Sequence, residues 1–283
     1  MEAPLISSTA QWRVVGASVT GTGHQKMGRG CDDAHRFRIS STGSLLLAVA
    51  DGAGSASRSA EGAACVVQAA LHTAETLLAQ QAEPESVEQW HATLSFIWWA
   101  VRNSLEAFAA SQTSAEEVMP VANTEEEGTP QLPQQPAIVS LREFATTLLL
   151  TIVMPQWIAV TQIGDGAVVA QYADGELQVL TVPDHGEYVN ESSFITDTNY
   201  LKKVQYVILP QNGLQGIALF TDGLEMLALD YATKQAYQPF FLPLFKFAAS
   251  SHATQQELAA FLASERVCKR TDDDKTIVLA VRL

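Results

Sequence analysis

The chain shows two kinds of hydrophobic pattern, and the change from one to the other predicts separate blocks of strands and helices. Short apolar or alternating runs over residues 12–20, 35–39 and 44–50 predict three strands. From Ser59, in SAEGAACVVQAALHTAETLLAQ, apolar residues recur three and four positions apart, which predicts a helix. The same spacing predicts a second helix from Val87 to Ser111. The polar, Gly-rich stretch GTGHQKMGRGCDDA is expected to be a loop.

The second half of the chain begins with four apolar runs, ATTLLLTIV, QWIAVTQIG, AVVAQYA and ELQVLTV, which are separated by short turns. We interpret these runs as an antiparallel meander. VQYVIL, GIALFT and the final TIVLAVRL predict three more strands, and helices are expected at residues 224–228, 242–251 and 255–268. Because strands and helices come in blocks rather than in strict alternation, the pattern predicts an α+β fold in which helices cover antiparallel sheets.

Two polar segments interrupt this pattern. Residues 112–140 are rich in Glu, Gln, Thr and Pro, and we expect them to form a mobile surface insertion. Residues 183–203 are polar and irregular, and we expect a loop or flap. No break in composition marks a second domain, so residues 1–283 are predicted to form one domain.

Composition and charge narrow the classes of function. The 283 residues are 47% hydrophobic, which is ample for a large core, and their formal net charge of -14 argues against nucleic-acid and anionic-membrane partners. The cysteines are odd in number and show no CxxC spacing, as expected for free thiols in a reducing compartment; they are Cys31, Cys65 and Cys268. No signal peptide and no apolar run long enough to span a bilayer is visible. A cytoplasmic location is therefore expected.

Carboxylates follow or precede apolar runs at five distant places in the chain. Asp51, Asp165 and Asp222 each end such a run and are followed by Gly. The run 272–274, three aspartates, stands just before the final strand, and Asp32 and Asp33 stand before AHRFRI. Side chains at strand ends can converge at one edge of a sheet, where carboxylates repel one another unless a cation lies between them. A site whose ligands are all oxygen atoms favours hard ions, Mg²⁺ or Mn²⁺, over zinc.

A structural interpretation of the same motifs stays open. Asp-Gly between alternating apolar residues is also a strong hairpin signal, and we interpret Asp174-Gly175 in this way. Asp165 fits either interpretation, and Asp222 fits a helix N-cap. Because the structural interpretation needs several independent coincidences, a shared metal site is favoured.

Such a site is suited to phosphate-ester hydrolysis. Two cations bridged by Asp51 would hold a hydroxide between them and would neutralise charge on a phosphoryl group. Gly52 would allow its carbonyl to turn toward an ion. Asp222 and Asp273 would complete the inner ligands from other strands.

Six motifs, in order, resemble the metal-dependent Ser/Thr protein phosphatases of type 2C, the PPM family, and its compact bacterial branch in particular. They are GCDDAH, VADGAGS, FATTLLL, QIGDGAV, LFTDGLE and DDDKTIV, and they extend over almost the whole chain. The resemblance implies an antiparallel β-sandwich flanked by helix pairs, in four α-β-β-α layers. It also implies two Mn²⁺ or Mg²⁺ ions and hydrolysis of phosphoserine or phosphothreonine in proteins.

The resemblance also assigns roles, motif by motif. Asp51 would bridge both metals, the carbonyl of Gly52 would bind one of them, and Asp222 and Asp273 would hold the other. Asp33, with Asp32 beside it, would act through metal-bound waters. Asp165 together with Asp222 would match a looser third-metal position. Thr146 and Thr147 would serve packing or hydrogen bonding behind the site.

The chain departs from the family pattern at two positions. The phosphate-binding Arg common in the family stands one residue farther from the acidic pair than Arg29 does here, so Arg29, His24 and Arg58 all remain candidates for the phosphate contact. Many relatives carry a His directly after the Asp-Gly as a proposed general acid, but this chain has Ala53. The proton for the leaving group must then come from water or another residue, for which His24 is a candidate.

The resemblance further predicts the biological setting. The polar stretch 183–203 would be a flap beside the active site, with Tyr188 and Asn190 shaping substrate access. The substrate would be a phosphorylated protein, modified by a partner Ser/Thr kinase, and the phosphatase would be a monomer. Two alternatives stay open: a phosphatase-like module that binds a phosphoprotein or regulator without turnover, and a phosphatase that acts on small phosphoesters.

Overall fold

The strands of the described residues form two five-stranded antiparallel sheets. The computed structural model describes residues 11–40, 43–80, 83–116, 139–184, 192–230 and 232–283. The first sheet has the order β1 (Trp12–Val19), β10 (Lys275–Arg282), β9 (Leu214–Phe220), β6 (Ala167–Tyr172) and β7 (Leu177–Val179). The second has the order β2 (Ala34–Ile39), β3 (Leu45–Ala50), β4 (Leu148–Val153), β5 (Trp157–Ile163) and β8 (Gln205–Pro210).

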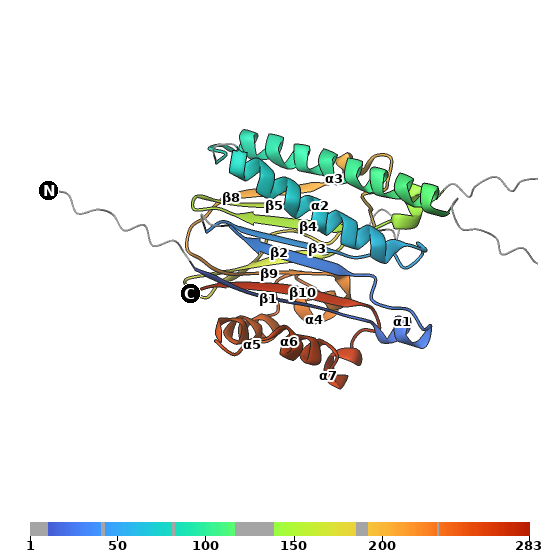
Figure 1. Cartoon of the computed structure of the whole chain (residues 1–283). Coiled ribbons are helices and arrows are strands. Elements are labelled where there is room, and N and C mark those ends of the chain that lie inside the picture. Colours follow the sequence, from blue (N-terminus) through green and yellow to red (C-terminus); the bar gives the residue numbers. More distant parts are fainter. Residues whose placement is uncertain (1–10, 41–42, 81–82, 117–138, 185–191, 231) are drawn as a thin grey trace, which may run out of the picture.

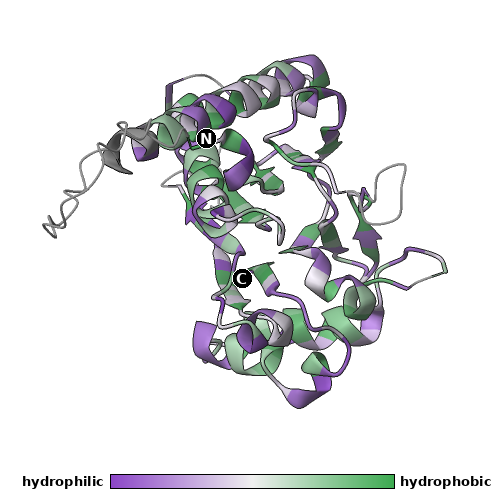
Figure 2. Ribbon diagram, turned by 90° about the vertical axis from the view of Figure 1, so that its right-hand side faces the viewer, coloured by the Kyte–Doolittle hydropathy of each residue, from purple (hydrophilic) through white to green (hydrophobic). Residues whose placement is uncertain are grey.

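Helices cover the outer faces of both sheets (Figure 1). On the second sheet lie α2 (Ser59–Gln80) and α3 (Val87–Glu116); on the first lie α4 (Glu225–Ala228), α5 (Gln238–Ala249), α6 (Gln255–Leu262) and α7 (Glu265–Cys268). The end-on view in Figure 2 shows the two helix groups on opposite sides of the strands, each with hydrophobic and hydrophilic residues, as expected for helices that bury one face. The predicted α+β fold with four α-β-β-α layers is confirmed.

Strand β3 explains why some runs are apolar without interruption. Leu45, Leu47 and Val49 lie in the core between the sheets, whereas Leu46 and Ala48 face the core under α2 and α3. Both faces of the strand are buried, so alternation with polar residues is lost. At about 25 cal/mol for each Å² of apolar surface buried, such doubly covered strands supply much of the hydrophobic stabilisation.

The predicted four-strand meander is wrong at its centre. β5 pairs with β4 and β8 in the second sheet, whereas β6 pairs with β9 and β7 in the first. The chain changes sheets at residues 164–166. Gly164 has φ +105, and a Cβ there would lie 2.4 Å from the side chain of Thr147, so only glycine fits this crossover. Alternation identifies both strands but does not tell which strand each one pairs with.

The predicted hairpin at Asp174-Gly175 is confirmed. These residues join β6 to β7, and Gly175 has φ +84, a conformation that glycine adopts without steric cost. The predicted loop before residue 34 contains a short helix, α1 (Thr22–Lys26), which lies at one end of the sandwich in Figure 1. Three 3-10 turns complete the described elements: η1 (Leu141–Phe144), η2 (Tyr200–Lys202) and η3 (Asp222–Leu224).

Several helix boundaries also differ from the predictions. α5 begins at Gln238, before the expected residue 242, because Pro239 is compatible with a first helical turn. The expected helix 255–268 is two helices, α6 and α7, since α6 ends at Leu262 and a new turn starts at Glu265. Among the described residues, no helix combines the length and apolar character needed to cross a membrane.

The two polar segments are described only in part. α3 runs to Glu116, so the first residues of the segment 112–140 are helical. Residues 117–138 lie outside the described residues, as do 185–191 of the expected flap. The mobile insertion therefore stays a prediction.

Candidate active site

Three Asp-Gly motifs from both sheets meet at one end of the sandwich. Asp51 follows β3, Asp165 lies in the crossover between β5 and β6, and Asp222 follows β9. One carboxylate oxygen from each of the three lies within 4.8 Å of the others. The convergence expected of these strand ends is therefore present in the structure.

Two carboxylate oxygens near this cluster are buried without a hydrogen-bond donor among the described residues. They are Oδ1 of Asp33 and Oδ1 of Asp222. The other oxygen of Asp33 accepts a hydrogen bond of 2.9 Å from Thr221 Oγ1. A buried carboxylate oxygen without a partner is costly. The donor set thus fits hard cations, which would be the missing partners.

The pKa values of these carboxyl groups are raised, because the groups are buried and lie close to one another. Burial raises the pKa of Asp51 well above its usual range, and the charges of Asp33 and Asp222 add to the shift. Burial raises the pKa of Asp33 to about 8. Burial and the neighbouring Asp165 raise the pKa of Asp222 to about 6. Without a countercharge, the folded protein resists ionisation of these groups.

The backbone of Asp51 and Gly52 is held by close packing. The Asp51 N–H donates to Thr147 Oγ1 (2.9 Å), and Thr146 Oγ1 donates to the Asp51 carbonyl (2.7 Å). A Cβ on Gly52 would lie 2.6 Å from the carbonyl oxygen of Asp32. Gly52 is not among the residues with positive φ. The glycine is therefore required because two chain segments approach closely, not because of a left-handed conformation.

Asp273 and Asp274 occupy different environments before β10. Asp273 is exposed, and its charge contributes to the raised pKa of Asp222. It is not part of the close group of Asp51, Asp165 and Asp222. Asp274 is only 3% exposed and accepts hydrogen bonds from the backbone N–H groups of Gly21 (2.6 Å) and Asp32 (2.5 Å).

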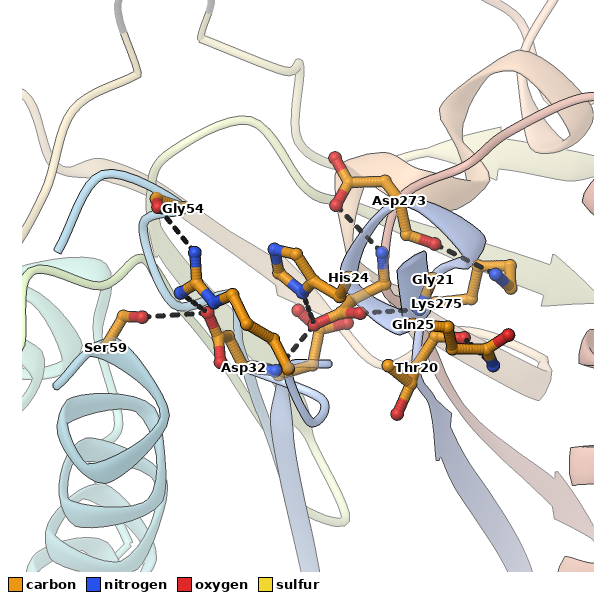
Figure 3. A network of polar contacts seen from close by, with 12 residues as sticks. Thr20, Gly21, His24, Gln25, Asp32, Gly54, Ser59, Asp273 and Lys275 are labelled. Atoms are coloured by element: carbon orange, nitrogen blue, oxygen red, sulfur yellow. Dashed lines mark hydrogen bonds and ion pairs between the residues drawn. The ribbon is translucent and has the colours of Figure 1, made fainter. Parts of the chain in front are cut away.

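Asp274 belongs to the predicted run of aspartates, but our sequence interpretation assigned it no role. It also lies 3.0 Å from Nδ1 of His24, and Figure 3 shows the resulting network around His24, Gly21 and Asp32. Its carboxylate thereby fixes the loop that carries the acidic pair. No sequence pattern distinguishes among three successive aspartates, because a single step along the chain moves a side chain from an exposed to a buried position.

The structure distinguishes among the three candidates for the phosphate contact by what each side chain contacts. Arg29 donates to Asp32 Oδ2 (2.5 Å) and to the Gly54 carbonyl (3.0 Å), and its side chain is 33% exposed. Arg58 instead forms a two-pronged ion pair with Glu61 (2.9 and 2.8 Å) and packs over the Phe144 ring. Arg58 is therefore held at the start of α2, whereas Arg29 and His24 lie beside the acidic pair.

The described end of the expected flap is anchored to the rest of the protein. Ser192 Oγ donates to Asp165 Oδ2. Farther along, Arg102 of α3 binds the carbonyl oxygens of Ile195 and Asp197. Tyr188 and Asn190, which were expected to shape substrate access, lie outside the described residues.

A groove of about 910 Å³ lies elsewhere, among α5, α6 and α7. Its lining includes Phe240, Phe247 and Phe261. It also includes basic residues in α7 and directly after it: Arg266, Lys269 and Arg270. None of the clustered aspartates lines it. The groove is therefore separate from the candidate active site.

Replacing Gly223 with alanine is expected to destabilise the protein. A Cβ there would lie 1.9 Å from the carbonyl oxygen of Asp274, a backbone atom that cannot turn aside. We expect the free energy of unfolding in urea to fall by at least about 2 kcal/mol. Gly54→Ala is the matched control, because a Cβ at Gly54 would have no other atom within 4 Å. Equal stability of the two variants would contradict the close approach of the Asp222 and Asp274 loops.

The fold and the carboxylate cluster agree with comparisons with known proteins. The sequence pattern described as protein phosphatase 2C matches residues 20–263, so the chain belongs to the protein phosphatase 2C family. It is 32% identical to serine/threonine-protein phosphatase 3 of Escherichia coli (strain K12) over 281 residues, which cover 95% of this chain and 98% of that protein. The family predicted from the ordered motifs is confirmed, and with it the predicted class of enzyme, a protein phosphatase.

Two solved structures show the same fold. Serine/threonine phosphatase Stp1 from Staphylococcus aureus is 14% identical, with a TM-score of 0.56 and coverage of 99% of each chain. The catalytic domain of serine threonine protein phosphatase PstP, solved in complex with two manganese ions, is 17% identical, with a TM-score of 0.55 and coverage of 96% of this chain and 98% of that one.

Proposed function

We propose that this protein hydrolyses phosphoserine and phosphothreonine in proteins, with two Mn²⁺ or Mg²⁺ ions held at the end of the sandwich. Asp51, the Gly52 carbonyl, Asp222 and Asp273 would hold the two ions. Asp33 would act through coordinated water, and Asp165 would contribute to a third position. Bound there, such ions lower the pKa of water and neutralise phosphoryl charge.

The observation that carries this proposal is the meeting of Asp51, Asp165 and Asp222 within 4.8 Å, beside two buried carboxylate oxygens without donors among the described residues. Carboxylates crowded in this way destabilise a fold unless cations bind. The manganese ions in the PstP structure support the same choice of metal.

The protein's own residues would bind and orient the phosphoryl group. Arg29 is the best placed cation, because it is partly exposed and lies between Asp32 and Gly54. A guanidinium can bind two phosphate oxygens at once. Thr221 and Thr147 hold Asp33 and the backbone of Asp51 in place. Rigid placement of this kind keeps the reacting groups aligned.

The remaining expectations stay predictions. They are a single domain over residues 1–283, a monomer, a partner Ser/Thr kinase that produces the substrate, and a cytoplasmic location. The substrate itself is proposed only as a class, a phosphorylated protein.

Phosphate release from a phosphothreonine peptide tests the proposed function. We expect turnover with Mn²⁺ or Mg²⁺ and none in EDTA. The same assay with a small sugar phosphate would separate a protein phosphatase from a small-molecule phosphatase. Absence of turnover on either substrate, with calorimetry showing that metal binds, would instead support a phosphoprotein-binding module without catalysis.

A further inference from the structure

The His24 ring is held in one orientation next to the candidate active site. Its Nδ1 lies 3.0 Å from Asp274 Oδ2, and the side chain is 12% exposed. Figure 3 shows the second ring nitrogen directed away from this contact. The ring belongs to α1, a short helix, and the contact to Asp274 fixes the Nδ1 edge of the ring.

Asp274 is itself fixed by two backbone donors. The N–H of Gly21 donates to Oδ1 (2.6 Å), and the N–H of Asp32 donates to Oδ2 (2.5 Å). An ionised carboxylate only accepts hydrogen bonds, so Nδ1 of His24 must carry the hydrogen that faces it. This leaves Nε2 as the nitrogen that can accept or release a proton on the side away from Asp274.

The distances among His24, Asp32 and Asp274 would also permit a metal ion, but their hydrogen bonds argue against one. Both oxygens of Asp274 already accept from N–H groups. Oδ2 of Asp32 already accepts from Arg29 and from Ser59. A cation would have to displace these donors. The group therefore fits a positioned histidine better than a metal site.

The ring is close to the residues that the proposed reaction uses. Asp274 directly follows Asp273, and its charge contributes to the raised pKa of Asp33. On the other side, Asp32 joins the His24 network to Arg29. Hydrogen bonds through Asp274 and Asp32 thus connect His24 with the proposed phosphate-binding arginine.

The proposed reaction needs a proton for its leaving group. A seryl or threonyl oxygen is a poor leaving group unless it gains a proton as its bond to phosphorus breaks. Ala53, which follows the Asp51-Gly52 motif, has no group to supply that proton. The His24 ring, next to Asp32 and Asp274, is the kind of side chain that most often supplies such a proton in enzymes.

We infer that His24, oriented by Asp274, is the general acid of this phosphatase, an inference that rests on the proposed function. The oxygen of a water molecule forms the new bond to phosphorus and gives up a proton to solvent, while the bond between phosphorus and the seryl or threonyl oxygen breaks. The proton on Nε2 passes to that oxygen, which leaves as the alcohol, and the neutral ring regains a proton from solvent. Asp274 is a positioning residue, because it acts through the ring.

Two substrates with different leaving groups test the inference. The nitrophenolate of p-nitrophenyl phosphate leaves without protonation, whereas the threonyl oxygen of a phosphopeptide does not. We expect His24→Gln to lower kcat on a phosphothreonine peptide by about 100- to 10,000-fold, and on p-nitrophenyl phosphate by less than about tenfold. His252→Gln, at an exposed position beyond α5, is the matched control and should match the wild-type protein on both substrates.

A second variant tests the role of Asp274. Asn accepts hydrogen bonds at only one of its two terminal atoms, so Asp274→Asn loses either the Gly21 contact or the Asp32 and His24 contacts. The group that orients the ring is then no longer fixed. We expect the same selective loss on the peptide, with manganese binding measured by calorimetry kept in both variants. Equal losses of His24→Gln on both substrates, or an unchanged rate on the peptide, would overturn the inference. A wild-type protein without activity on either substrate would overturn the proposed function instead.

Discussion

The Asp222→Asn variant is expected to lose metal-dependent phosphate release from a phosphothreonine peptide by more than about 100-fold. Loss of a residue that only orients a metal ligand costs about 10- to 100-fold, and a direct ligand should cost more. Asn has nearly the same shape, and removing one charge from beside Asp51 and Asp165 relieves repulsion. We therefore expect the metal-free variant to unfold at a temperature no lower than that of the wild-type protein.

Asp174→Asn is the matched control for this variant. Asp174 belongs to the same Asp-Gly motif but lies exposed in the hairpin between β6 and β7. Its Oδ1 accepts a hydrogen bond from the N–H of Glu176, so the change should affect the turn alone. Activity of Asp222→Asn within a few-fold of the control would show that the carboxylate is not part of the reaction site.

The parts of the fold that could be predicted are those in which the spacing of apolar residues reflects which side chains are buried. Helix α2 has the bounds that its spacing predicts, Ser59 to Gln80. The change of sheet between β5 and β6 was not predictable, because alternation describes the faces of a strand and not its partner. The signal that could have indicated it is Gly164-Asp165-Gly166, where two glycines next to buried strands permit close approach to Thr147 and Phe220.

The site was predictable where a motif repeats and less so where a single residue matters. Three Asp-Gly motifs after apolar runs predict the three aspartates that meet. Arg58 could have been excluded, because Glu61 three residues later at a helix start is suited to an ion pair. The role of Asp274 depends on contacts with Gly21, His24 and Asp32, which lie near the other end of the chain and which no local pattern reports.

In EDTA, the free energy of unfolding is expected to fall as pH rises from about 4 to about 8. Burial raises the pKa of Asp33 from 3.8 to about 8, so the folded state holds a proton that the unfolded state releases. The stability that this proton gives is fully present below pH 3.8 and is lost as the pH rises through about 8. Asp222, with a pKa raised to about 6, adds to the loss in the lower half of this range.

Manganese should reverse the trend, because the ion binds the ionised carboxylates and only the folded protein presents them together. Thermal unfolding at pH 5 and pH 8 should show a larger rise in Tm with Mn²⁺ at pH 8. The net charge of -14 also disfavours the folded state at high pH, so the metal-free Asp33→Asn variant is the necessary comparison. It should lose less stability over this range than the wild-type protein. Equal losses would mean that the fall comes from the surface charge and not from the crowded carboxylates.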